Sequence, residues 1–494
     1  MQVVTVDQRG PVKASLVFAV GARDETYITS GITHVIEHLA LDGLPEPVYP
    51  TNGSVESRLT QFDFSGPADV VAGSLTLLAQ SLRRIAEARF SDAELSKAVK
   101  VIRAEGPASA VAPAVAEAAV HAVGMRGAGV VGASQGWLER LTVDEVAAFA
   151  STYFVGENAT LFCVGRLPET MDLSALPAGR RNKVPATAPT VVDGPREYVS
   201  EFPQASLSFR SAGSSTELYD LRTGLLQCLT RRLLRELRAT DGLIYGVDAD
   251  QIQLSAEEDL VTLAFDVRPQ NAVRVLKHAL KALRQMRDSG PSDGDVEAAL
   301  AQMEHELEEP EEYVDLGFAT AFCGLFGESP SGPRAIASAL ESRTPSAVRE
   351  CFAQLERTLM AGLPEEALDE ETDPTRGHLA PLRLPRPAER IEGVSFGRSL
   401  LGRINREPRS TELIIGDSGL YACLGGDSTL VPWEDIVGVE LFDDGDVPES
   451  LTIRTAEGFE LGFITATFRR GSQAVRMILE RVPKRLQVID EDAP

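Results

Sequence analysis

Apolar positions along residues 1–361 predict two stretches in which strands and helices follow one another in the same order. Each stretch reads as a strand, a helix, a second strand, a long helix, further helices and a closing strand. The run Ala159–Gly165 (ATLFCVG) is the predicted closing strand of the first stretch. Strands grouped with helices on one side are typical of an α+β sandwich.

Short matching segments suggest that the two stretches are repeats. Three pairs occur in the same order, at offsets of 191, 201 and 202 residues. The pairs are Lys13–Ala22 with Gln204–Gly213, Phe90–Glu94 with Pro291–Asp295, and Leu141–Phe149 with Arg343–Cys351. A shared order at nearly one offset predicts two homologous α/β units, over residues 1–180 and 197–361.

The pattern of apolar and polar positions changes after a linker predicted over about residues 362–392. This linker is rich in proline and acidic residues. Short alternating runs then predict strands, and Gly471–Val482 predicts a final amphipathic helix. The runs are Thr411–Ile415, Gly419–Cys423, Ile436–Phe442, Leu451–Arg454 and Phe459–Ile464. Together with the segment Val431–Ile436 (VPWEDI), this pattern resembles a pleckstrin-homology-like domain. The resemblance implies a small β-barrel with a C-terminal helix over residues 393–487, acting as an interaction or spacer module.

Net charge and cysteine content limit the expected binding partners and the expected cellular location. The formal net charge of −25 disfavours nucleic acid and makes a membrane surface an unlikely partner. The five cysteines are scattered and odd in number, which favours reduced thiols and a cytoplasmic location. The first twenty residues read as two strands and a turn, unlike a signal peptide, and no apolar run approaches the length of a membrane span.

The strongest chemical signal is His34-x-x-Glu37-His38. Positions i and i+4 of a helix share one face, so both imidazoles can reach one metal ion while Glu37 lies beside them. Two neutral nitrogen ligands and a carboxylate that holds water are what a zinc hydrolase needs. The order is that of the inverzincin motif. The competing interpretation is a solvated polar helix face.

Further segments give the chain a family resemblance over about residues 1–360. Val20–Glu25 (VGARDE), Ser30–His38 (SGITHVIEH), Asn52-Gly53 and a capped helix ending Val101–Glu105 (VIRAE) resemble the pitrilysin/insulinase-type zinc metallopeptidases, which include mitochondrial processing peptidase. The resemblance implies Glu105 as the third zinc ligand, with Glu117 as the alternative. Asn52 and Gly53 would then mark the sheet edge where a peptide substrate adds as a strand.

The second unit has no such histidine motif, but it carries Arg238 and Tyr245, which resemble the family's arginine–tyrosine pair. A guanidinium and a phenol can donate hydrogen bonds to a developing oxyanion. In the family four units form a closed clamshell, and the pair serves the zinc of the facing half. The resemblance therefore implies that this chain is half of a clamshell and pairs with a copy of itself or with a related subunit.

Two functions follow from these observations. The first is a zinc-dependent endopeptidase acting on peptides or unfolded segments, with Glu37 as the base; leader removal and peptide clearance both fit. The second is a non-catalytic or half-active subunit that binds peptide or a partner as a scaffold. It is motivated by Ala98, where relatives often carry a supporting glutamate, and by an interval from His38 to Glu105 that is roughly ten residues shorter than the family pattern.

Overall fold

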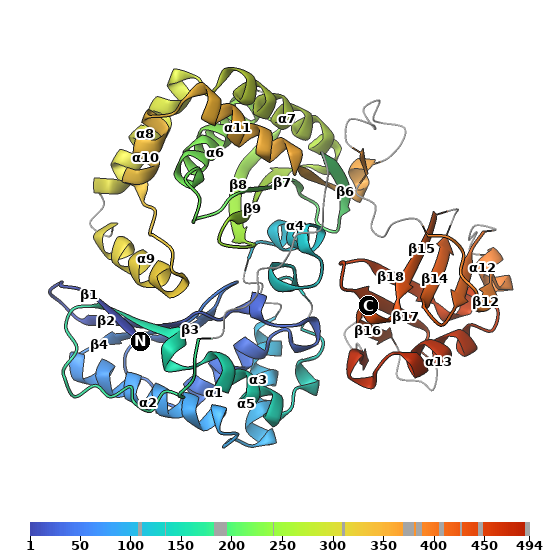
Figure 1. The fold of residues 1–494 in the computed structure, drawn as a ribbon, viewed down its shortest axis with the longest axis horizontal. Coiled ribbons are helices and arrows are strands. Elements are labelled where there is room, and N and C mark those ends of the chain that lie inside the picture. Colours follow the sequence, from blue (N-terminus) through green and yellow to red (C-terminus); the bar gives the residue numbers. More distant parts are fainter. Residues whose placement is uncertain are drawn as a thin grey trace.

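The computed structural model describes residues 1–106, 111–133, 135–181, 195–240, 242–308, 312–368, 380–381, 388–404, 410–424, 427–442 and 448–489. Two sheets with their helices form the left part of the molecule in Figure 1, and the C-terminal residues form a smaller part beside them. The fold is mixed α/β, as the order of predicted elements indicates.

The first sheet has the strand order β1-β5-β2-β4-β3. Its strands are β1 (Gln2–Val6), β2 (Val12–Phe18), β3 (Thr51–Val55), β4 (Thr60–Gly66) and β5 (Ala159–Val164). The helices on one face are α1 (Ile32–Asp42), α2 (Ala68–Ala86), α3 (Asp92–Glu105) and α5 (Val143–Tyr153). Alternate residues of β4 are buried, so one face of the strand lies in the core, where Leu16, Phe62 and Leu75 pack between sheet and helices.

The second sheet has the order β11-β6-β10-β7-β9-β8, which apart from β11 matches the order and the strand directions of the first. Its strands are β6 (Arg196–Ser200), β7 (Ala205–Ala212), β8 (Ile244–Gln253), β9 (Glu258–Val267), β10 (Met360–Pro364) and β11 (Ala380–Pro381). The helices are α6 (Tyr219–Leu233), α7 (Ala272–Ser289), α8 (Asp293–Glu308), α10 (Pro333–Glu341) and α11 (Pro345–Arg357). Of the three segment pairs found in the sequence, the first falls on β2 and β7, the second at the starts of α3 and α8, and the third on α5 and α11.

Each sheet receives a helix from the other stretch of chain. Helix α9 (Glu312–Phe326) lies on β1 and β5, where Phe318 and Ala321 pack against Phe162. Helix α4 (Pro113–Val123) lies on the second sheet, with Val115 in one cluster with Leu260. Figure 1 shows both helices between the two sheets. We call the first sheet with its helices the first part and the second sheet with its helices the second part. The exchange of α4 and α9 joins these two parts through buried apolar contacts.

The C-terminal strands form two four-stranded sheets, so the predicted closed barrel is wrong for the described residues. One sheet has the order β12-β13-β14-β15, and the other β18-β17-β16-β19. The strands are β12 (Val394–Gly397), β13 (Glu412–Ile415), β14 (Gly419–Leu424), β15 (Asp427–Pro432), β16 (Ile436–Phe442), β17 (Ser450–Thr455), β18 (Glu460–Ile464) and β19 (Gln487–Ile489). A 3-10 turn at Trp433–Asp435 separates β15 from β16, so the ladder of the first sheet does not continue into the second.

One apolar core serves both C-terminal sheets. Leu413 of the first sheet and Ile453 of the second lie in the same cluster as Ile478 of helix α13 (Gly471–Arg481). The short helix α12 (Leu400–Ile404) precedes β13. The predicted final helix is confirmed, and the sheets pack as two layers around the core it helps to close.

The predicted linker after residue 361 begins later than expected. Strand β10 continues to Pro364, and β11 pairs with β6 in parallel. Both belong to the second sheet, although proline and acidic residues surround them. Local composition predicts a linker here, whereas pairing with a distant strand adds these residues to the sheet.

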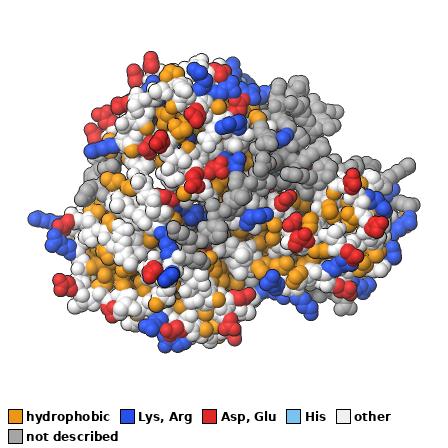
Figure 2. Space-filling view, viewed as in Figure 1, with side chains coloured by type: hydrophobic (Ala, Val, Ile, Leu, Met, Phe, Trp, Pro, Cys, Tyr) orange, Lys and Arg blue, Asp and Glu red, His pale blue; other side chains and the backbone are white. Residues whose placement is uncertain are grey.

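Charged side chains are distributed over the surface. On the face drawn in Figure 2, Lys and Arg side chains of the described residues are interspersed with Asp and Glu and gather in no large field of one sign. In the part of the chain that the structure describes, no helix is long and apolar enough to cross a membrane.

His121 of α4 makes the contact between the two parts sensitive to pH. Its ring stacks on Tyr198 with a centroid distance of 4.1 Å, and burial lowers the pKa of His121 to about 4. The unfolded chain binds this proton near pH 6.5. The contribution of the neutral ring to stability is therefore complete above pH 6.5 and is lost progressively as the pH falls from 6.5 to about 4.

We expect His121→Phe to keep the ring contact and to remove this dependence. Between pH 7.5 and 4.5 the parent should lose roughly 2–3 kcal/mol more in its free energy of unfolding than the variant. Urea unfolding at the two pH values measures the difference, and His305→Phe on the exposed surface of α8 is the control. Equal losses in parent and His121→Phe would contradict the assignment.

Candidate metal centre

Helix α1 begins where Gly31 adopts φ = 90°, in the left-handed region that glycine tolerates. The carboxylate of Glu25 satisfies the first helical amides: it accepts hydrogen bonds from the N–H groups of Gly31 at 2.7 Å and Thr33 at 2.9 Å. Ile32, Val35, Ile36 and Leu39 face the core. The opposite side of the helix therefore presents the polar positions of the motif.

The three side chains predicted as metal ligands lie together. The Nε2 atoms of His34 and His38 are 3.1 Å apart, and Oε2 of Glu105 lies 3.4 Å from each. All three ligand atoms fall within 4.8 Å of one another, a grouping that could hold a metal ion. The two imidazoles are half-buried, and Glu105 opens toward solvent.

Helix α3 carries Glu105 in its last turn. It begins at a capping box in which Ser91 and Glu94 exchange hydrogen bonds. Leu95, Val99 and Ile102 recur at helical spacing on its buried face, which fixes its rotation against α1. Glu105 is thereby directed to the histidines of α1.

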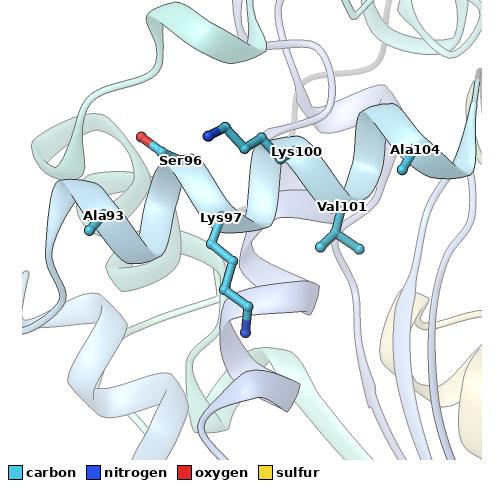
Figure 3. Close-up of a pocket in the computed structure, with 6 residues that line it drawn as sticks. All are labelled: Ala93, Ser96, Lys97, Lys100, Val101 and Ala104. Atoms are coloured by element: carbon cyan, nitrogen blue, oxygen red, sulfur yellow. The ribbon is translucent and has the colours of Figure 1, made fainter.

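The outer face of α3 is a separate feature. Figure 3 shows the side chains that line a shallow surface pocket along this helix, Ala93, Ser96, Lys97, Lys100, Val101 and Ala104. None of them is a predicted ligand. Lys97 pairs with Asp42 at 2.7 Å and so joins α3 to the end of α1 on the exposed side.

The alternative ligand Glu117 is placed elsewhere. Its carboxylate accepts hydrogen bonds from the Ser200 hydroxyl at 2.7 Å and from the N–H of Glu201 at 2.8 Å, at the contact between α4 and β6. Ala98, where a supporting glutamate occurs in relatives, is buried in the core of the first part. Glu105 is the carboxylate that the structure brings to the two histidines.

Glu37 lies beside the two histidines. Its Oε2 lies 3.5 Å from Nε2 of His34 and 3.8 Å from Nε2 of His38. Burial, and then the neighbouring Glu105 carboxylate, raise the pKa of Glu37 to about 7. Burial lowers the pKa of His34, as does His38, against the opposing effect of Glu105. The neutral imidazole is therefore favoured, which is the form that ligates metal.

Strand β3 passes directly over Glu37. A Cβ added at Gly53 would lie 2.1 Å from Oε1 of Glu37, so only glycine lets the backbone approach the carboxylate this closely. Strand β3 is the edge of the first sheet. A pocket of about 340 Å³ adjoins the strand; its lining includes Asn52, Ser15 and Asp63, and the Ser15 hydroxyl donates to Asp63 at 2.5 Å. The predicted substrate-binding residues thus lie at a sheet edge beside the candidate base.

Arg238 and Tyr245 lie together on the second part. Arg238 belongs to the π-helix Leu234–Thr240, and its guanidinium carbon is 5.2 Å from the ring centroid of Tyr245 at the start of β8. Tyr245 is 74% exposed. Within the described residues, no hydrogen bond or ion pair connects either side chain to the two histidines. The two side chains contact each other and Tyr245 is accessible, but neither is bonded to the cluster of His34, His38 and Glu105 in the described part of the chain.

Sequence reasoning missed how α1 and α3 are held in place. Glu25 stands in the quoted segment Val20–Glu25, and an acidic residue a few positions before a predicted helix start was the available signal. Arg103 was not singled out; it pairs with Glu139 at 2.7 Å and donates to the carbonyl of Gln135 at 2.9 Å. No local pattern marks this second anchor.

Comparisons with known proteins agree with this architecture. Residues 140–303 match the family described as Peptidase M16 inactive domain. A protease from Helicobacter pylori is similar in structure, with a TM-score of 0.61 at 15% identity over 73% of this chain and 96% of that chain. For a chain of complex III2 from Candida albicans the values are 0.60 and 14%, over 75% and 95%. For a peptidase M16 inactive domain from Pseudomonas fluorescens they are 0.58 and 16%, over 73% and 95%. No curated protein sequence matches the chain.

These findings define a class of protein by its fold. The chain has a mixed α/β fold similar to that of M16 peptidases. Within it, residues 140–303 are related to the inactive type of M16 domain. That segment begins after His34, Glu37, His38 and Glu105, and it covers α5 and β5 of the first part and the second part as far as α8.

Proposed function

We propose that this protein is a zinc-dependent endopeptidase that cleaves peptides or unfolded segments. The observation that carries the proposal is the convergence of His34, His38 and Glu105 from two helices on one point, with Glu37 beside them. The alternative of a solvated polar helix face does not account for this arrangement, because the histidines are half-buried and the carboxylate of another helix meets them.

The donor set fits zinc. Zinc–nitrogen bonds of about 2.0–2.1 Å in a tetrahedron place neighbouring ligand atoms about 3.3 Å apart. The distances between the three ligand atoms are 3.1, 3.4 and 3.4 Å. When bound, zinc would polarise the substrate carbonyl and make water a stronger nucleophile at neutral pH.

The chain's own residues would then carry out the remaining steps. Glu37, whose pKa is raised to about 7, accepts the proton of the attacking water and returns it to the leaving amine. The open edge of β3 binds the peptide as an added strand and brings its backbone past Glu37. Because this mode uses backbone groups, it favours extended segments over folded proteins.

The arginine–tyrosine pair completes the proposed site from outside the chain. Arg238 and Tyr245 are exposed on the second part and would donate hydrogen bonds to the oxyanion at the centre of a facing subunit. We therefore propose that the chain forms half of a clamshell. Each subunit would contribute two homologous units, and two subunits would form the closed clamshell. Each chain carries both half-sites, so a homodimer suffices, and a related subunit could replace one copy.

The C-terminal residues would form a pleckstrin-homology-like interaction module. Support comes from the two small sheets closed by α13 around one core. The proposed partner is a protein surface rather than a membrane, because the net charge is −25.

A second candidate function is a scaffold subunit that binds peptide without cleaving it. The match of residues 140–303 to an inactive M16 domain favours it. In such a subunit β3 would still bind extended peptides, and a partner would supply the chemistry.

Zinc content distinguishes the peptidase from the scaffold, because only the peptidase requires bound zinc. Protein purified without added metal should contain about one zinc per chain by elemental analysis, as expected for a single three-ligand site. His34→Ala should reduce this to background, because two ligands hold zinc poorly, whereas His305→Ala on α8 should not. Glu105→Gln should lower the content and Glu117→Gln should leave it unchanged. Zinc that is absent from the parent, or indifferent to His34, would refute the peptidase and leave the scaffold.

A further inference from the structure

The C-terminal domain packs against the segments that hold the metal ligands. Tyr27, two residues after Glu25, is 2% exposed, and its hydroxyl donates to Oε1 of Glu440 on β16 at 2.5 Å. Glu440 is itself buried and accepts from Arg454 on β17 at 3.2 Å. A buried charged acceptor with two donors fixes the position of the tyrosine far more firmly than a surface contact would.

Trp137 makes a second contact with the same domain. Its ring meets that of Tyr27 edge to face at 5.1 Å, and both pack in one buried cluster with Val488. A Cβ at Gly438 of β16 would lie 2.6 Å from the Tyr27 ring and 2.8 Å from that of Trp137. The backbone of the C-terminal sheet therefore lies directly on both aromatic rings.

The loop around Trp137 reaches both ligand-bearing helices. A Cβ at Gly31, which begins α1, would lie 2.8 Å from Cδ2 of Leu138. On the other side, the loop contacts Arg103 of α3, which lies two residues before Glu105. The Arg103 guanidinium donates hydrogen bonds to the Glu139 carboxylate and to the Gln135 carbonyl. The loop thus touches the start of α1 and the end of α3.

A third contact lies beside these. The N–H of Met125 donates to the carbonyl of Ala456 at 3.0 Å, and a Cβ at Gly124 would lie 2.2 Å from that oxygen. A Cβ at Gly458 would likewise lie 2.5 Å from Cγ1 of Val120 on α4. The domain is therefore seated against two neighbouring regions of the first part, and its orientation is fixed.

We propose that the C-terminal domain is a brace for the metal centre, which sets the affinity of His34, His38 and Glu105 for metal by holding Tyr27 and the Trp137 loop. Tyr27 holds the segment that carries Glu25, and Glu25 holds the first amides of α1. The brace rests on the proposed function, because it acts on metal affinity only if these ligands bind metal. Tyr27 and Trp137 are positioning residues, and Glu440 and Gly438 are their contacts on the domain.

Tyr27→Phe tests the brace in the full-length chain. The change removes one hydroxyl and keeps the ring. Loss of an outer contact of this kind should weaken zinc binding about tenfold, measured by competition with a chromophoric chelator. In metal-free protein, hydrogen exchange of the peptide spanning residues 27–36 should accelerate by about the same factor, because the amides of Gly31 and Thr33 lose support. Tyr198→Phe, which alters a buried hydroxyl of the second sheet, is the matched control and should change neither quantity.

Gly438→Ala approaches the same contact from the domain side. The added methyl group meets the Tyr27 ring and should weaken zinc binding and accelerate exchange in the same peptide. Affinity within twofold of the parent and unchanged exchange in both variants would overturn the brace. A parent that binds no zinc would overturn the proposed function instead, and the exchange of metal-free protein would still show whether the domain holds α1.

Discussion

Glu37→Gln is expected to abolish peptide cleavage while leaving zinc bound. The amide keeps the shape of the side chain but cannot accept the proton of the attacking water, and such a base contributes about 10²- to 10⁴-fold to the rate. Glu37 is not among the three converging ligand atoms, so metal content should stay at the level of the parent. A mixture of unstructured peptides followed by mass spectrometry measures cleavage, and elemental analysis measures zinc.

Glu157→Gln, at an exposed glutamate of the first part, is the control and should cleave like the parent. Cleavage within tenfold of the parent in Glu37→Gln would remove Glu37 as the base. Loss of both zinc and cleavage would instead make Glu37 a contributor to metal binding, contrary to its placement.

Gly53→Ala is expected to cost about 100-fold in cleavage, since displacement of a catalytic group by about 1 Å can have that effect. The new methyl group would lie 2.1 Å from Oε1 of Glu37, so either the carboxylate or β3 must shift. The core of the first part does not include Gly53, and the fold should persist. Steady-state cleavage and thermal unfolding together separate displacement from unfolding.

Gly73→Ala on α2 is the matched substitution, because a Cβ there meets nothing within 4 Å. It should cleave normally and unfold at the same or a slightly higher temperature, as an alanine favours the helix. If Gly53→Ala cleaves like Gly73→Ala, β3 does not set the position of Glu37.

Sequence reasoning succeeded where a signal is local. The spacing of His34, Glu37 and His38 reports one helix face, and the capping box at Ser91 reports where the helix of Glu105 begins. Both depend on residues within a few positions, so helical geometry is enough to relate them. The meeting of the two helices was expected only through resemblance to a family.

Features that depend on distant partners could not be predicted in this way. Strand pairing decides whether the strands form a barrel or two sheets, and this pairing involves residues far apart in the sequence. Strand β15 (Asp427–Pro432) also has too few apolar residues to be predicted from the hydrophobic pattern. The contact of Tyr27 with Glu440 joins residues 413 positions apart, and neither has a neighbourhood that marks it. The position of β3 over Glu37 likewise follows from packing, although the glycine that permits it was visible.

The exchange of α4 and α9 between the two sheets also governs how the chain can fold during synthesis. Strand β5 completes the first sheet at Val164, yet the helix that covers β1 and β5 begins only at Glu312. It leaves the ribosome roughly 150 residues later, which takes about 7–30 seconds at about 5–20 residues per second. During that interval Val6, Phe162 and Val164 lack their apolar cover, and a nascent-chain chaperone that binds extended apolar surface would find its target there.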